Sequence, residues 1–370
     1  MKKGLTLLAL WGLIFLVACQ NPAQEEGEAR EDWQPYTFTF YDTFDTIVDV
    51  TVYTQSEEEA KTYEDYVHQR FLDLHQLFTS FEDVEGVTNV KTLNDRAGGG
   101  PLQVDPLLFD LLETSLKRQE DLSSKVNIAM GSLTQTWHQY REGHIQGSLS
   151  QDLEGAKAEA QLPPQEELEE AARHMDPSKI ILDKDQLTVE ILDPKIKLDV
   201  GAVAKGYATE VVAQELEAMG LKSGFISAGG NVRTIGRPMD GREAFAIGLQ
   251  NPQAIRDPQG GHDNVLAVLE VQDLSVVSSG DYQRFYQVEG KIYHHIIDPD
   301  SLYPGEHFQA TTVVTKDSGL GDFLSTAIFL MPYEEGRALI DSLDGVEAYW
   351  LDREGHAFMT PGLEAMLKFK

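Results

Sequence analysis

The chain has 370 residues, of which 41% are hydrophobic and 25% charged, a composition typical of a globular protein rather than a disordered one. The 30 Lys and Arg residues face 61 Asp and Glu residues, a formal net charge of -31. This balance excludes a nucleic-acid binder that relies on neutralising phosphates, and broad docking on an anionic lipid surface. A polyanionic ligand would need a metal ion or a local cluster of N–H donors. The single cysteine, Cys19, excludes an intramolecular disulfide.

The N-terminus has the pattern of a targeting segment. Lys2 and Lys3 precede an uncharged run over 5–18. This run is too short to span a bilayer, which takes about 20 residues. The run ends in Leu-Val-Ala-Cys, which resembles a bacterial lipobox. Residues 1–18 are therefore expected to be a signal peptide, and Cys19 to carry a lipid that anchors the protein at the extracytoplasmic face of the cell membrane. The alternative is an uncleaved short anchor or a buried thiol.

Residues 19–35 are acidic and contain Pro22, so they are expected to form a solvated tether. Residues 36–370 contain no internal repeat and are expected to form one catalytic unit of one or two lobes. In its first half, alternation predicts strands and apolar steps of three and four predict helices. We expect strands at 36–40 and 47–53, helices at 57–78 and 106–122, a loop at 87–100, and exposed helices within 151–173.

From residue 180 onward, short strands are interspersed with helices without regular βαβ order. This mixture favours an α+β fold over a doubly wound parallel sheet. Strands are expected at 180–182, 187–192, 196–198, 224–228, 244–249, 265–271, 311–315 and 348–351, and helices at 203–219, 322–331 and 334–343.

The stretch 197–207 is the most informative for chemistry. A predicted strand ends at Asp199, the chain turns on Gly201, and a helix begins near Lys205. The free N–H groups of a helix start favour an anion such as a pyrophosphate, and Lys205 adds a positive charge. The alternative is a helix capped by Asp199, with Lys205 on the surface. A second strand followed by Gly229-Gly230 permits close ligand approach or a simple tight turn.

Two further stretches carry candidate site residues. If 291–297 is a strand, His294 and His295 lie on opposite faces and cannot both ligate one metal. Asp322 and Thr326 are four residues apart, hence on one helical face, and their oxygens suit Mg²⁺. Ser325 fits that face less well. The alternative for the second stretch is a helix cap with a core threonine.

Taken in order, five motifs resemble the ApbE family, the FAD:protein FMN transferases. The likeness covers about 41–351 and rests on LDVGAVAKGYA (198–208), ISAGGNV (226–232), SSGDYQRF (278–285), YHHIIDP (293–299) and GDFLSTAIF (321–329). This resemblance implies an ApbE-like α+β fold, FAD as substrate and Mg²⁺ as cofactor.

The resemblance also implies roles for individual residues. Asp199 and Lys205 match positions that contact FAD, and His295 and Ile297 match positions that border the flavin. Phe44, Phe81, Lys125, Val126 and Asn127 match further FAD-binding positions, with Phe44 in place of a common methionine and Asn127 in place of a common aspartate. The implied metal ligands are the Ala202 carbonyl, Asp322 and Thr326, with Ser325 where some members have aspartate.

The expected reaction is attack by a threonine hydroxyl of an acceptor flavoprotein on the FAD phosphorus nearer riboflavin, with release of AMP. Lys205 and Asp322 would stabilise charge, and His295 is the candidate general base. One alternative is Mg²⁺-dependent hydrolysis of FAD to FMN and AMP at the same site. Another is a non-catalytic lipoprotein that binds flavin.

Overall fold

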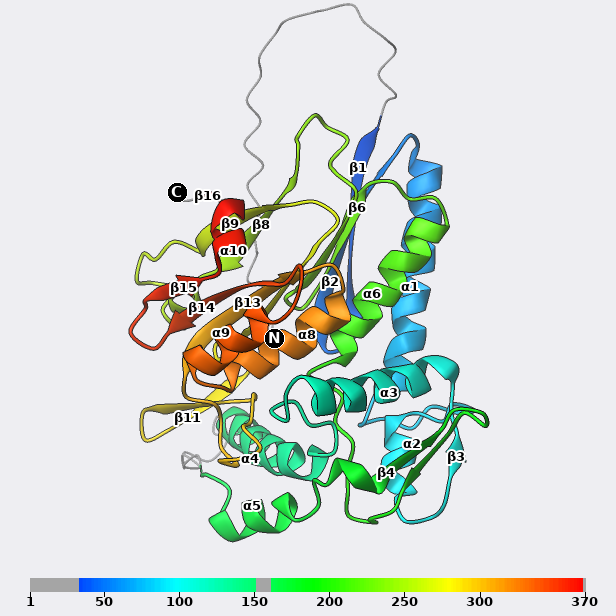
Figure 1. Ribbon diagram of the computed structural model, residues 1–370, viewed down its shortest axis with the longest axis vertical. Helices are drawn as coiled ribbons and strands as arrows, with labels where there is room; N and C mark the ends of the chain where they lie inside the picture. Colours follow the sequence, from blue (N-terminus) through cyan, green and yellow to red (C-terminus); the bar gives the residue numbers. More distant parts are fainter. Residues whose placement is uncertain (1–32, 151–160, 369–370) are drawn as a thin grey trace, which may run out of the picture. The chain divides into compact units, whose positions relative to one another are not determined.

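The structure is a computed structural model that describes residues 33–150 and 161–368, with side chains left undescribed for 144–150. The predicted signal peptide, Cys19 and most of the predicted tether lie outside the described residues. The expected α+β fold is confirmed, since helices and mixed-size sheets share one chain (Figure 1). The helices are α1 (Glu57–Phe78), α2 (Val90–Asp95), α3 (Pro106–Asp121), α4 (Gly131–Ser150), α5 (Gln165–Ala172), α6 (Ala204–Ala218), α7 (Pro252–Arg256), α8 (Ser318–Phe329), α9 (Tyr333–Asp341) and α10 (Pro361–Met366), with a 3-10 turn at Pro177–Lys179.

The largest sheet has eight strands in the order β1-β2-β6-β7-β10-β13-β14-β15, and every neighbouring pair is antiparallel. The smaller sheets have the orders β16-β9-β8, β3-β5-β4 and β11-β12. The strands are β1 (Gln34–Thr43), β2 (Thr46–Thr54), β3 (Leu102–Gln103), β4 (Ile180–Asp183), β5 (Thr188–Ile191), β6 (Gly224–Ala228), β7 (Asn231–Ile235), β8 (Phe245–Gln250), β9 (Val265–Val271), β10 (Ser275–Gly280), β11 (Phe285–Val288), β12 (Lys291–His294), β13 (Phe308–Thr315), β14 (Glu347–Asp352), β15 (Ala357–Met359) and β16 (Leu367–Lys368).

The large sheet is buried on both faces because its side chains alternate between two cores. Helices α1, α6 and α8 cover one face, where Val313 joins their apolar side chains (Figure 1). The neighbouring Val314 points the other way, into a core shared with β8, β9 and α10. A third cluster, which includes Trp137, Leu168 and Tyr286, joins α4 and α5 to the β11–β12 hairpin.

Two local predictions were wrong, and some elements were not predicted. The predicted loop at 87–100 contains α2, which begins at a capping box formed by Asn89 and Thr92 rather than at an apolar pattern. The predicted strand at 196–198 makes one isolated bridge, between Lys197 and Met130. Helix α4 was not predicted, because the sequence from Gly131 onward is polar around most of the helix.

Candidate functional site

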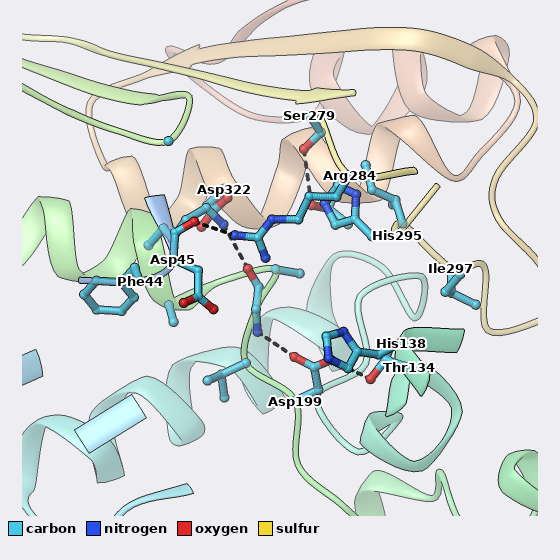
Figure 2. Close-up of a pocket in the computed structure, with 18 of the residues that line it drawn as sticks. Phe44, Asp45, Thr134, His138, Asp199, Ser279, Arg284, His295, Ile297 and Asp322 are labelled. Atoms are coloured by element: carbon cyan, nitrogen blue, oxygen red, sulfur yellow. Dashed lines mark hydrogen bonds between the residues drawn. The ribbon is translucent and has the colours of Figure 1, made fainter. Parts of the chain in front are cut away.

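A pocket of about 690 Å³ lies where α6, α8, α4, the β1–β2 turn and the β11–β12 hairpin meet (Figure 2). Residues from both halves of the chain line it, including segments that are more than 200 positions apart. Every candidate cofactor-binding, catalytic or metal-ligating residue except Ser325 is on its wall: Phe44, Phe81, Lys125, Val126, Asn127, Asp199, Ala202, Lys205, His295, Ile297, Asp322 and Thr326.

Asp199 lies at the pocket side of the turn that leads into α6. Its carboxylate accepts hydrogen bonds from the Gly201 N–H at 2.8 Å and from the Thr134 hydroxyl at 2.5 Å. The side chain therefore tightens the turn and joins it to α4. Asp199 is not the helix cap of the alternative interpretation, because the N-cap residue is Val203 and makes no side-chain cap bond.

Lys205 stands in the first turn of α6, as predicted, and is half-buried. Its ammonium donates to the Gly201 carbonyl oxygen at 3.0 Å, so the positive charge is held beside the helix start. The Val203 and Ala204 N–H groups at this helix start donate to the Val200 carbonyl, so the Lys205 charge and the helix dipole are what favour an anion here.

Asp322 comes from α8, one turn after that helix begins at Ser318, and is 4% exposed. Its Oδ2 accepts from the Gly206 N–H at 2.8 Å, which joins the two predicted site segments directly. Burial raises the pKa of Asp322, while the Lys205 charge, the Gly206 amide and a hydrogen bond from Asn231 act in the opposite direction. A cation in the pocket would stabilise this buried carboxylate.

Ser325 and Thr326 follow Asp322 on α8 but face different ways. Thr326 lines the pocket, whereas Ser325 is fully buried behind the wall. The Ser325 hydroxyl lies 2.8 Å from the Ser279 hydroxyl and donates to the Asp322 carbonyl at 3.1 Å. The structure therefore does not bring Ser325 to the pocket, and its hydroxyl positions Ser279, which does line it. The reason is the 100° helical step between adjacent residues.

His294 and His295 diverge as predicted, although β12 ends at His294 and does not continue to residue 297. His294 is buried, and His295 is exposed on the pocket wall. The pKa of His295 is lowered to about 3, first by desolvation within the concave pocket and then by the positive charges around it, which include Arg284 and Lys205. His295 is therefore neutral at pH 7.

The β1–β2 turn brings Phe44 and Asp45 to the pocket, both with positive φ, 53° and 49°. The Phe44 N–H donates to His75 Nδ1 at 3.1 Å, and its ring packs edge-on against Phe71. Arg284, from the opposite wall, donates to the Asp45 carbonyl oxygen at 2.8 Å (Figure 2). This contact places a guanidinium across the pocket.

The segment 125–127 lines the pocket while its polar atoms bind the protein itself. The Lys125 ammonium lies 2.7 Å from carboxylate oxygens of Asp298 and Asp300. The Asn127 amide donates to the Met175 carbonyl at 2.8 Å, and its Oδ1 accepts from the Ala129 N–H at 2.9 Å. These contacts fix the shape of the wall.

Sequence reasoning missed several pocket residues. Thr134, His138 and Arg141 share one face of α4, and a spacing of four and three residues was the available signal. Arg141 lies 2.7 Å from His138 Nδ1, and the His138 ring lies 5.6 Å from that of Phe81, which is 60% exposed. Figure 2 shows Thr134 and His138 beside Asp199.

The pocket thus combines two kinds of charge. The cations Lys205, Arg284 and Arg141 lie on its wall together with the carboxylates of Asp199 and Asp322. Such a site can hold a phosphate-bearing ligand despite the net charge of -31, because the local cations offset the field of the whole chain.

Comparisons with known proteins show which family this chain resembles. A model described as the ApbE family matches residues 44–350. A Treponema pallidum protein named FAD:protein FMN transferase is 31% identical over 75% of this chain and 76% of its own length. A Klebsiella pneumoniae protein of the same name is 29% identical over 75% of this chain and 80% of its own.

Solved structures are similar too. The ApbE protein of Thermotoga maritima superposes with a TM-score of 0.75 at 25% identity, covering 90% of this chain and 99% of that one. The flavin transferase ApbE of Vibrio cholerae gives a TM-score of 0.71 at 18% identity over 90% of this chain and 99% of its own, a likeness of fold.

Proposed function

Because this chain belongs to the ApbE family, we propose that it is an FAD:protein FMN transferase, which moves FMN from FAD to a threonine hydroxyl of an acceptor flavoprotein and releases AMP. The observation that carries the proposal is the direct contact between Asp322 and Gly206, which puts a buried carboxylate beside Lys205 and a helix N-terminus in one pocket. Phosphate oxygens are the ligands that this combination suits.

The residues present fit a Mg²⁺ ion. The Asp322 carboxylate, the Thr326 hydroxyl and the Ala202 carbonyl are hard oxygen donors on one pocket wall, and Asn231 Oδ1 is buried there without a hydrogen-bond partner among the described residues. We propose that the first three would hold the ion. When bound, Mg²⁺ would supply positive charge that neutralises phosphate oxygens.

The protein's own side chains would position the reactants. Lys205 and Arg284 lie on the wall to bind phosphate oxygens of FAD, and Asp199 lies where it can accept hydrogen bonds from a polar group of the nucleotide. The threonine oxygen forms a bond to the phosphorus nearer riboflavin. The bond from that phosphorus to the bridging oxygen breaks, and AMP leaves with its electron pair.

His295 is the proposed acceptor of the threonine proton. It is neutral at pH 7, it faces the pocket, and no hydrogen bond among the described residues occupies its ring. Desolvation is the first cause of its low pKa, and the charges of Arg284 and Lys205 add to it; an anionic dinucleotide would offset those charges and so favour a proton on His295.

The test is mass spectrometry of an acceptor domain incubated with the protein, FAD and Mg²⁺. The wild-type protein should add the mass of FMN to the acceptor and release AMP. Asp322→Ala should reduce the rate by at least about 10³-fold, as expected when a ligand of the ion that would neutralise the phosphate oxygens is lost. Ser325→Ala is the matched control on the same helix and should retain activity within about tenfold. Full activity in Asp322→Ala would contradict the site assignment.

The same incubation separates transfer from hydrolysis. Water could reach His295 because the residue is exposed on the pocket wall, so FAD hydrolysis to FMN and AMP is the second candidate. Free FMN and unmodified acceptor would identify a hydrolase. Tight FAD binding without AMP release would identify a non-catalytic flavin-binding protein.

We also propose that the protein is attached to the extracytoplasmic face of a bacterial membrane by a lipid on Cys19. The support is the sequence of residues 1–19 alone. Across residues 33–150 and 161–368, no helix is both long and apolar enough to cross a membrane. Mass spectrometry of the protein from membranes tests the anchor, since Cys19→Ala should abolish lipidation and leave FMN transfer intact.

A further inference from the structure

His294, the residue before the proposed base, uses both of its ring nitrogens inside the protein. Its Nε2 lies 2.8 Å from the Gly305 carbonyl oxygen, and its Nδ1 accepts from the Ile296 N–H at 3.2 Å. A carbonyl oxygen only accepts, so Nε2 carries the proton, and Nδ1 carries none because it accepts. The ring is therefore held as the neutral Nε2–H tautomer, in keeping with a pKa that burial lowers to about 4.

The hydrogen bond from the Ile296 N–H to the His294 ring spans His295. The Ile296 N–H belongs to the same peptide unit as the His295 carbonyl, so the His294 ring fixes the peptide plane after His295. The plane before it is fixed as well, because the His295 N–H donates to the Arg284 carbonyl at 3.1 Å. With both planes fixed, the Cα–Cβ direction of His295 is set, and the side chain points to the pocket between two buried neighbours.

The partner of His294 is itself well anchored. The Gly305 N–H donates to the Ile296 carbonyl at 3.0 Å, and the Gly305 carbonyl also accepts from Arg353 at 3.0 Å. Arg353 is paired with Asp281, which is fully buried and also paired with Arg256. His294 therefore connects the histidine segment to a rigid ion-paired support.

We propose that His294 is a positioning residue, whose neutral ring holds the backbone on either side of His295 so that the His295 imidazole faces the reacting hydroxyl. This rests on the proposed function, in which His295 accepts the proton of the acceptor threonine. His294 itself touches no reactant, because it acts through hydrogen bonds to Ile296 and Gly305.

Two substitutions separate hydrogen bonding from packing. His294 also packs edge-on against Phe329, with ring centroids 5.4 Å apart. His294→Phe keeps an aromatic ring there but loses both hydrogen bonds. His294→Asn loses the ring but offers an oxygen to the Ile296 N–H, the arrangement of an Asx turn. If His294 only packs, His294→Phe should have the higher kcat. If it positions His295, His294→Asn should have the higher kcat.

The experiment measures kcat and the KM for FAD from AMP release with a flavin-acceptor domain. We expect His294→Phe to lower kcat about 100-fold with the KM for FAD changed less than about threefold, since misplacing a reacting group by an ångström has an effect of that size. His294→Asn should recover about tenfold of that loss. His307→Phe, the same change at an exposed histidine in the adjoining loop, should leave both constants unchanged.

Wild-type kcat in His294→Phe, or a higher kcat in Phe than in Asn, would overturn the positioning role. A second readout needs no turnover: in ¹⁵N-histidine-labelled protein, the Nδ1 resonance of His294 should lie in the unprotonated range and Nε2 in the protonated range. The reverse assignment also overturns it. A wild-type protein that releases no AMP overturns the transferase proposal instead, and the tautomer then tests whether His294 holds the backbone beside His295.

Discussion

Asn127 shows how one side chain adapts the pocket wall of this chain. Its amide nitrogen donates to the Met175 carbonyl, while its Oδ1 accepts from the Ala129 N–H. A carboxylate supplies only acceptors, so it could not make the first of these bonds. The local role of the amide is therefore to connect two loops.

Asn127→Asp should lower the free energy of unfolding by about 1–3 kcal/mol. The Met175 carbonyl would lose its donor and face a carboxylate at a position that is 9% exposed. Urea unfolding measures the change. Asn264→Asp, the same substitution at an exposed position, should shift the free energy by less than about 0.5 kcal/mol. An equal effect at both positions would contradict this account.

Asp45 illustrates backbone strain at the pocket. The loop between Thr43 and Thr46 has two residues, and such tight hairpin turns favour asparagine or glycine, whereas Phe44 and Asp45 occupy the left-handed region here. The Phe44 N–H bond to His75 and the Arg284 bond to the Asp45 carbonyl hold the turn.

Asp45→Gly should raise the free energy of unfolding by about 1 kcal/mol, since glycine adopts positive φ without steric cost and keeps the carbonyl that Arg284 binds. Thermal unfolding checks this. Asp65→Gly, within α1, should instead destabilise by about 1 kcal/mol, as glycine does inside helices. A drop in Tm for Asp45→Gly would show that the turn is not strained.

At the level of elements, α6 and α8 approach each other closely at Gly206. A Cβ atom there would lie 2.4 Å from both the Asp322 Cβ and the Ser318 carbonyl oxygen. Neither atom belongs to a flexible side-chain end, so the two helices can meet in this way only with glycine. The closeness is also what allows the Gly206 N–H to bind the Asp322 carboxylate.

Gly206→Ala should destabilise the protein by about 1–3 kcal/mol and weaken FAD binding, because α8 must move and carry Asp322 with it. Urea unfolding and FAD titration measure the two effects. Gly143→Ala is the matched control, since an added Cβ on α4 meets nothing within 4 Å and should be neutral or stabilising. Unchanged FAD affinity in Gly206→Ala would contradict the claim that the contact between α6 and α8 supports FAD binding.

Local patterns predicted the elements with strong periodicity and failed elsewhere. The apolar spacing of residues 57–78 predicted the bounds of α1, and the strand predicted at 265–271 coincides with β9. Helix α4 lacks such a stripe, because Thr134, His138 and Arg141 give it a polar face towards the pocket. The residues that face the pocket therefore remove the apolar periodicity from which a helix would be predicted.

The candidate site could be predicted in pieces but not as an assembly. Spacing along the chain paired Asp199 with Lys205 and Asp322 with Thr326. Only the tertiary fold shows that Gly206 binds Asp322 and that Arg284 reaches Asp45. That Ser325 lies off the pocket face agrees with the helical spacing of the sequence. Contacts across such sequence distances depend on sheet order, which a single sequence does not display.

For the whole molecule, buried histidine makes stability depend on pH. The pKa of His294 is lowered to about 4 from the usual 6.5. Between those values the unfolded chain binds a proton that the folded chain does not, so this group's contribution is complete above pH 6.5 and is lost as pH falls towards 4.

The wild-type protein should therefore lose more stability than His294→Asn between pH 6.5 and 4, by a few kcal/mol, and the gap between the two should narrow at low pH. Urea midpoints across this range measure it. His307→Asn, at an exposed position, should follow the wild-type curve. Parallel curves for wild type and His294→Asn would contradict the burial of a neutral ring.

The pocket draws its walls from the first strands and from α8, near the opposite end of the polypeptide. A growing chain therefore has no complete binding place for a dinucleotide until almost all of it has been synthesised. Flavin binding cannot assist the early steps of folding, and any fragment that ends before residue 326 should not bind flavin.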